Sequence, residues 1–236
     1  MFWLIPLIIG TILLGVFLFF RVKEKRVTAV IIKGFVSLMF IITAIVAFLT
    51  SQNPKSLFIV FVLIGLVFGL FGDILLDIKY ISVNHELLFT KLGFLAFGIG
   101  HICYITGLFS KFFDFQNNPL YLTIPIVVSI AAATFTVLME KFTPIRYEKM
   151  KMFVAVYAVI LFLVTSLYMS AAIQYGWHAT LLNLMAIGFI FFALSDLILN
   201  NTYFSTGFSG PIFIITNHVF YYVGQFLIAV ALFYLF

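Results

Sequence analysis

The chain has 236 residues, of which 64% are apolar and only 9% are charged, with a formal net charge of +5 and a mean hydropathy of +1.24. Soluble domains contain about 25% charged residues, so this composition excludes an ordinary soluble protein. The single cysteine, Cys103, lies in an apolar stretch, which excludes a framework of disulfide bonds within the chain.

Apolar stretches of about 20 residues are long enough to cross the hydrocarbon core of a bilayer as helices. Charged and turn-forming segments divide this chain into eight such stretches, and no segment between them is long enough for a soluble domain. The predicted spans are 2–20, 27–50, 56–76, 86–109, 120–139, 152–173, 178–199 and 211–236. The sequence therefore predicts an all-α integral membrane protein with eight transmembrane helices in a single domain, residues 1–236.

Turn-forming residues mark three of the breaks, namely Ser51-Gln52-Asn53-Pro54, Asn117-Asn118-Pro119 and Asn200-Asn201-Thr202. The first apolar stretch has no basic residues before it and no small-residue cleavage site. We therefore expect it to be a membrane helix and not a signal peptide.

The basic residues fall mainly in alternate loops. Of the 13 Lys and Arg residues, all except Lys55 and Lys111 lie in or near the first, third and fifth loops, with Lys33 assigned to the first. The positive-inside rule makes these loops cytoplasmic, so that with eight spans both termini lie outside. We expect a multi-pass protein of the bacterial cytoplasmic membrane, with the lipid bilayer as a partner. Because these charges lie in short loops, we expect no nucleic-acid partner.

Polar residues inside the spans recur in the same order. Asp73 and His101 lie in the third and fourth spans, and Asp196 and His218 lie in the seventh and eighth. The first and fifth loops are also both basic. An offset of four helices preserves direction, so this pattern predicts two parallel repeats, residues 1–118 and 119–236. Chance similarity between apolar segments is the alternative explanation.

Ionisable side chains within a membrane span cost about 2.5–3.5 kcal/mol each on insertion scales, and they therefore tend to mark function. At about 1.5 Å per residue, Asp73, His101, Asp196 and His218 all lie in the cytoplasmic half, where we expect them to line one cavity. No Lys or Arg is expected at that depth. One of the two carboxyl groups should then keep its proton and act as a general acid while the other stays ionised.

Neighbouring positions extend these polar faces. Asp77 follows Asp73 by four residues, and Tyr104 follows His101 by three. The remaining candidates for orienting or binding the substrate are Ser195, His218, Tyr222 and Gln225. Hydrogen bonding between helices is the alternative role for such residues. Asp77 is expected at the cytoplasmic boundary, so that Asp77→Asn should retain substantial activity.

Four short motifs resemble a known family. They are Gly72-Asp73 followed by Leu76, Phe97 with His101 and Tyr104, Gly188 with Ser195-Asp196, and Tyr222 with Gln225. At these residues the chain is similar to the YhhN-like lysoplasmalogenases, polytopic proteins of this length with about eight spans. Asp77 and His218 lie outside the pattern of that family.

The resemblance implies a lysophospholipid substrate. Members of that family are implicated in hydrolysing the vinyl ether bond of lysoplasmalogens to a fatty aldehyde and a glycerophospho-base. Protonation of the alkenyl β-carbon requires an acid, and the resulting oxocarbenium ion requires an anion. We assign these roles to Asp73 and Asp196, with His101 and Tyr104 orienting a carboxyl group or the water, and we expect no metal or cofactor.

Three other functions fit the same residues. A Zn²⁺ hydrolase of the intramembrane ceramidase type would use the histidines and aspartates as ligands, although no compact His-x-x-x-His spacing is present. A proton-coupled transporter would use the carboxylates as a relay, although the spans that hold them lack paired Gly/Pro interruptions. A purely structural membrane protein is the third alternative.

Overall fold

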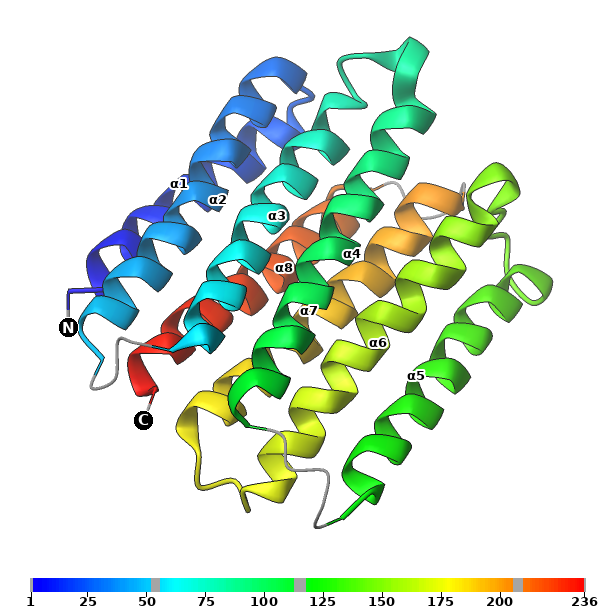
Figure 1. The fold of residues 1–236 in the computed structure, drawn as a ribbon. Helices are drawn as coiled ribbons and strands as arrows, with labels where there is room; N and C mark the ends of the chain where they lie inside the picture. The colour runs from blue at the N-terminus through cyan, green and yellow to red at the C-terminus, as the bar shows by residue number, and fades with distance from the viewer. Residues whose placement is uncertain (1, 52–55, 113–117, 206–209, 236) are drawn as a thin grey trace.

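The computed structural model describes residues 2–51, 56–112, 118–205 and 210–235, and this part of the chain is helical without strands (Figure 1). The long helices are α1 (Leu4–Val22), α2 (Arg26–Leu49), α3 (Leu57–Ile78), α4 (Glu86–Lys111), α5 (Leu120–Leu138), α6 (Lys151–Gln174), α7 (Thr180–Phe204) and α8 (Pro211–Ala231). All eight are long and apolar enough to cross a membrane. The predicted all-α class and the eight long apolar helices are confirmed for the described residues, and they indicate a multi-pass membrane protein.

The helix ends agree with the predicted spans to within two residues, except at the C-terminal ends of α7 and α8. The turn predicted at Asn200-Asn201-Thr202 is wrong, because α7 continues to Phe204. The Asn201 side chain donates to the Leu197 carbonyl at 2.8 Å, so the polar group is satisfied within its own helix. Asn118 does precede a helix, and its side chain accepts a hydrogen bond from the Leu120 N–H at 3.0 Å. The predicted turn at 51–54 lies largely outside the described residues.

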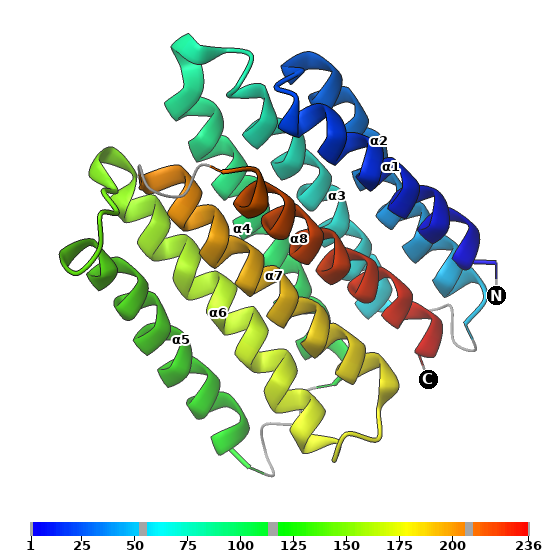
Figure 2. The same cartoon turned by 180° about the vertical axis from the view of Figure 1, so that it is seen from behind.

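The helices lie side by side in one bundle, with both termini at the same end (Figures 1 and 2). The connections α1–α2, α3–α4 and α5–α6 lie at the opposite end, which we call the basic end after its residues 23–25, 79–85 and 139–150. α1 and α5 are at the edges of the bundle, and α5 packs almost entirely on α6. Their outer faces carry exposed apolar side chains such as Ile12, Val127 and Phe135, as expected of surfaces that contact lipid.

Helix packing in the two halves follows one scheme. Within each half consecutive helices pack together, and between the halves α4 packs on α6 while α8 packs on α2. Close approaches of glycine match as well: a Cβ on Gly100 would lie 3.0 Å from the Gly65 carbonyl oxygen, and one on Gly224 would lie 2.7 Å from that of Gly188. Small residues let helix backbones approach in this way. Two parallel repeats would produce this arrangement, although their origin by duplication stays a prediction.

Candidate active site

Asp196, Tyr157 and His101 form one polar group, which we call the Asp196 centre. The Asp196 carboxylate on α7 accepts a hydrogen bond from the Tyr157 hydroxyl on α6. His101 Nε2 on α4 lies 3.4 Å from the same hydroxyl. The His101 side chain is buried, and its ring packs edge-on against that of Phe192 with centroids 4.7 Å apart. Three helices from both halves therefore fix the orientation of this carboxylate.

A cavity of about 40 Å³ lies beside Asp196. Thr136 and Asn200 are the uncharged polar residues in its otherwise mostly apolar wall, to which Tyr157 also contributes. This volume has room for about two or three water molecules. A neighbouring apolar groove of about 230 Å³ between α4 and α6 shares Phe94 and Tyr157 with the cavity. Asp196 is therefore next to a space for water and near a groove suited to an alkyl chain.

Asp196 forms no ion pair with Lys or Arg within the described part of the chain. Burial of an unpaired charge is costly, because the surrounding apolar groups cannot replace its hydration. A carboxyl group in these surroundings is suited to donate a proton and less suited to hold a fixed charge. For Asp196 the structure thus agrees with the expected lack of a cation partner.

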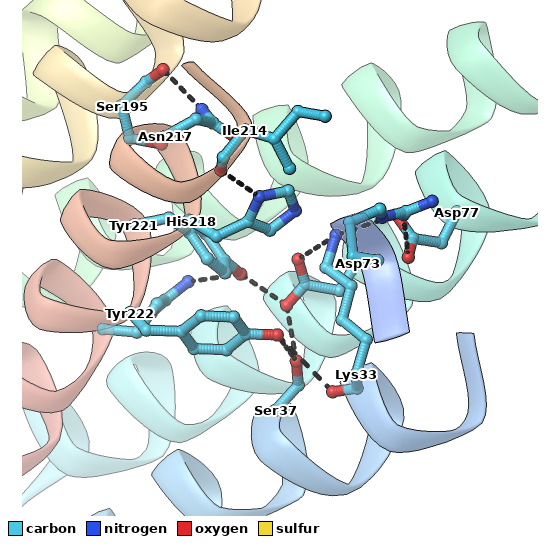
Figure 3. Close-up of polar contacts among 12 residues, drawn as sticks. Lys33, Ser37, Asp73, Asp77, Ser195, Ile214, Asn217, His218, Tyr221 and Tyr222 are labelled. Atoms are coloured by element: carbon cyan, nitrogen blue, oxygen red, sulfur yellow. Dashed lines mark hydrogen bonds and ion pairs between the residues drawn. The ribbon is translucent and has the colours of Figure 1, made fainter. Parts of the chain in front are cut away.

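Asp73 differs, because it has a cation partner (Figure 3). Lys33 Nζ lies 3.2 Å from Asp73 Oδ1, while Ser37 and Tyr221 donate to Oδ2 at 2.6 and 2.7 Å. The expectation that no Lys reaches this depth is therefore wrong. Lys33 lies inside α2 and not in the first loop, and its side chain is buried. Both carboxylate oxygens of Asp73 thus contact protein groups, and Asp73 is not in the wall of the cavity beside Asp196.

Asp77 is also buried, in the last turn of α3, and its expected position at the membrane boundary stays a prediction. α3 extends to Ile78, two residues further than the predicted span, so that Asp77 lies within the helix. Its carboxylate forms an ion pair with Arg21 on α1 and another with Lys33, the latter at 3.2 Å. Arg21, Lys33, Asp73 and Asp77, which we call the charged cluster, thus join α1, α2 and α3.

Three other predicted site residues form hydrogen bonds within or between helices, namely Ser195, Tyr222 and Gln225. Asn217 donates to the Ser195 carbonyl and hydroxyl oxygens at 2.7 and 3.1 Å, which ties α8 to α7. The Tyr222 hydroxyl lies 3.0 Å from that of Ser37, and Gln225 donates to the Tyr221 hydroxyl at 3.0 Å. These contacts place Tyr222 and Gln225 around Asp73.

Tyr104 and His218 lie apart from each other. The Tyr104 hydroxyl is buried without a hydrogen-bond partner in the described part of the chain, and its ring centroid is 6.2 Å from that of His101. His218 Nδ1 hydrogen-bonds to the Ile214 carbonyl of its own helix at 2.8 Å. His218 lines a different cavity, which also contains Asp77. The four polar residues expected in one cavity therefore belong to two separate centres.

The packing of the two halves gives a different correspondence of residues from the one expected. Asp73 lies eight residues after Gly65, and Asp196 lies eight residues after Gly188. In the partner helices, however, the residue after Gly100 is His101, whereas the residue after Gly224 is Gln225. The counterpart of His101 is thus Gln225 and not His218. Each of the two contacts a tyrosine that donates to a carboxylate.

A metal site is not assembled by these residues. In the part of the chain that the structure describes, no group of three or more His, Cys, Asp or Glu side chains could hold a metal ion. His101 belongs to the Asp196 centre, while His218 lies near Asp77. The donor set that the zinc alternative requires is therefore divided between two places.

The comparison with protein families identifies the chain. A model of the YhhN family matches residues 28–232, which include Asp73, Asp196 and the long helices from α2, without its first two residues, to α8. The chain belongs to the YhhN family. No curated protein and no solved structure matches this YhhN chain. Arg21 of the charged cluster precedes the matched residues.

Sequence reasoning missed the partners of the carboxylates in this YhhN protein. Lys33 and Ser37 lie four residues apart on one face of α2, and this spacing within an apolar span was an available signal. Tyr221 shares a helix face with Gln225, again at a spacing of four. Tyr157 offered no comparable signal, because it is one of 11 tyrosines and has no polar neighbour at helical spacing.

Proposed function

We propose that this YhhN protein hydrolyses the vinyl ether bond of lysoplasmalogens within the membrane, with Asp196 as the proton donor. The observation that carries the proposal is the position of the Asp196 carboxyl group, held by Tyr157, free of ion pairs within the described residues and open to a cavity. Family membership is consistent with a hydrolase. We also propose that the protein lies in the bacterial cytoplasmic membrane with its basic end in the cytoplasm.

The reaction uses one proton and one water molecule. Asp196 transfers its proton to the β-carbon of the alkenyl group, which leaves an oxocarbenium ion and an Asp196 carboxylate. Water from the adjoining cavity adds to the cationic carbon and returns a proton to that carboxylate. The hemiacetal then collapses to the fatty aldehyde and the glycerol hydroxyl of the head-group fragment, so that the enzyme is regenerated.

The neighbouring groups orient and stabilise these species. The Tyr157 hydroxyl holds Asp196 in position, and His101 contacts the other side of that hydroxyl. Asp73 is close enough to interact electrostatically with Asp196, and it forms an ion pair with Lys33 at 3.2 Å. In this proposal Asp73 is the fixed anion that stabilises the oxocarbenium ion. The alkenyl chain lies in the apolar groove between α4 and α6.

The test is aldehyde release from a lysoplasmalogen by purified protein. We expect turnover that persists in the presence of a chelator and slows in heavy water, because a proton moves to carbon in the limiting step. The rate should fall with rising pH as the acid loses its proton. A different result would indicate a metal-bound hydroxide: activity that is lost on chelation, returns when Zn²⁺ is added and rises with pH.

Variants locate the acid. Asp196→Asn should reduce kcat by about 10²- to 10⁴-fold, the usual contribution of a positioned general acid, without loss of the folded protein. Glu148→Gln, which changes an exposed acidic residue at the basic end, is the matched control and should retain full activity. Near-normal turnover by Asp196→Asn would disprove the role of this residue.

One observation favours proton-coupled transport as a second candidate. A continuous series of polar contacts joins α1, α2, α3 and α8 through Arg21, Asp77, Lys33, Asp73, Tyr221 and Gln225. Buried ionisable chains of this kind form proton pathways in transporters. Proteoliposomes with an internal pH-sensitive dye distinguish the two: proton flux without aldehyde release would favour transport.

A further inference from the structure

A second cavity, of about 300 Å³, opens at the basic end between the two halves of the bundle. Arg21, Glu24 and Arg26 from the α1–α2 region line one side, and Thr202 and Tyr203 from the end of α7 line the other. It lies beyond the charged cluster, since Asp77 forms part of its wall. Unlike the cavity beside Asp196, it is rich in charged and hydroxyl-bearing side chains.

The cations of this cavity are not equivalent. Arg21 forms an ion pair with Asp77, and its guanidinium stacks 4.5 Å from the centre of the Tyr80 ring. Arg26 donates to the Tyr80 carbonyl oxygen at 3.1 Å but forms no ion pair within the described part of the chain. A guanidinium has five N–H donors, so most of those on Arg26 are available to a ligand. Arg26 is therefore an unneutralised cation with donors suited to a phosphate.

The cavity also contains one acidic group outside the ion pairs. Asp77 is neutralised by Arg21 and Lys33. Glu24 remains, on an exposed turn with φ 56°. With one cation and one anion left over, the lining complements a ligand that itself carries both charges.

The cavity adjoins the reaction centre. Leu199 lines both this cavity and the smaller one beside Asp196, so the two spaces share a wall residue. A lipid with its head group in the larger cavity would thus place the start of its hydrocarbon chain near Asp196. We propose that the cavity binds the zwitterionic phosphodiester head group of a lysophospholipid, with Arg26 on the phosphate and Glu24 on the amine. This inference rests on the proposed function for the position of the chain.

The test uses ligands that cannot be hydrolysed. Tritium-labelled 1-O-hexadecyl glycerophosphoethanolamine, the corresponding phosphate monoester and 1-O-hexadecylglycerol share one saturated chain and differ only in the head. Binding of each to the purified protein is measured in dodecyl maltoside, with inorganic phosphate as a competitor. We expect the phosphoethanolamine lipid to bind about tenfold more tightly than the alcohol, because charge-assisted hydrogen bonds to phosphate are strong.

Three variants assign the contacts. Arg26→Gln should reduce the affinity for the phosphoethanolamine lipid to the affinity for the alcohol. Glu24→Gln should abolish the preference of the protein for the phosphoethanolamine lipid over the phosphate monoester. Lys23→Gln, which removes an exposed neighbouring cation, is the control and should bind like the unmodified protein. Melting temperatures confirm that each variant is folded.

Several outcomes would overturn the proposal. They are equal affinity for lipid and alcohol, undiminished binding by Arg26→Gln, an unchanged preference in Glu24→Gln, and full displacement by inorganic phosphate alone, which would indicate a site for the free ion. Because the ligands lack the vinyl ether bond, binding is independent of hydrolysis. Head-group selectivity without aldehyde release from a lysoplasmalogen would refute the proposed function and leave this site standing.

Discussion

Replacement of Lys33 by Met tests the charged cluster directly. Lys33 Nζ lies 3.2 Å from one carboxylate oxygen of Asp73 and 3.2 Å from one of Asp77. Removal of one partner from a buried ion pair costs about 3–5 kcal/mol, because the remaining charge is left uncompensated. Asp77 retains Arg21, and Asp73 retains two hydrogen bonds, so we expect a loss near 3 kcal/mol. Folded proteins are stable by only about 5–15 kcal/mol, so this loss is large.

A second substitution should repair most of this loss. In Lys33→Met/Asp73→Asn the uncompensated charge is gone, and the double variant should be more stable than Lys33→Met alone. Unfolding in mixed detergent micelles provides the free energies. Lys23→Met, whose ammonium lies 4.3 Å from the Phe19 ring centre at the surface, is the control and should change stability by less than about 0.5 kcal/mol. If Lys33→Met unfolds like the unmodified protein, or if the second substitution adds a further loss, the ion pairs do not stabilise the fold.

Four further substitutions, one of them with a control, test other features. Tyr157→Phe should lower kcat at least about tenfold with little loss of stability, since the hydroxyl orients the acid; unchanged kcat in the aldehyde assay would exclude that role. Asp77→Asn should lower the melting temperature, because it leaves two buried cations with one carboxylate fewer. Gly224→Leu should prevent folding, as its Cβ would lie 2.7 Å from a carbonyl oxygen of α7, whereas Gly210→Ala meets nothing within 4 Å and should fold, as size-exclusion chromatography can establish. Burial lowers the pKa of Lys79 from 10.5 to about 8, so its charge costs stability below pH 8 and this cost disappears as the pH rises to 10.5. Lys79→Met should therefore raise the melting temperature at pH 7 and raise it less at pH 10.

The fold followed from the sequence because the membrane imposes the length and composition of each helix. Seven short connections left little freedom in the boundaries, and the C-terminal ends of α7 and α8 were the main errors. The Asn-Asn-Thr segment was interpreted as a turn, yet Asn201 and Thr202 donate to carbonyls one turn back in the helix. Composition alone does not distinguish these two uses of the same side chains.

The candidate site was predicted only in part. The high cost of a carboxylate in lipid singled out Asp73 and Asp196, but spacing along one helix says nothing about side chains on another. Lys33 illustrates the difficulty. A lysine near a helix end ordinarily extends toward the interface, and the count of loop charges assumed this behaviour. Here two carboxylates on α3 draw its ammonium inward instead.

The packing of the two halves places other residues in corresponding positions than the sequence suggested, for a related reason. Identical residue types suggested that His101 and His218 correspond. Packing instead aligns the glycines, because a close approach of two backbones tolerates no other residue, whereas a polar side chain can be exchanged.

Each carboxylate is completed by a helix from the opposite half of the chain. α8 supplies Tyr221 and Gln225 to Asp73, and α4 supplies His101 to the Asp196 centre. If one four-helix ancestor gave rise to both halves, that ancestor could assemble either centre only as a homodimer, in which the two centres were identical. Fusion of the two copies into one polypeptide would release them from this identity. One centre could then acquire a lysine partner, as Asp73 has in Lys33, while the other kept a carboxyl group without one.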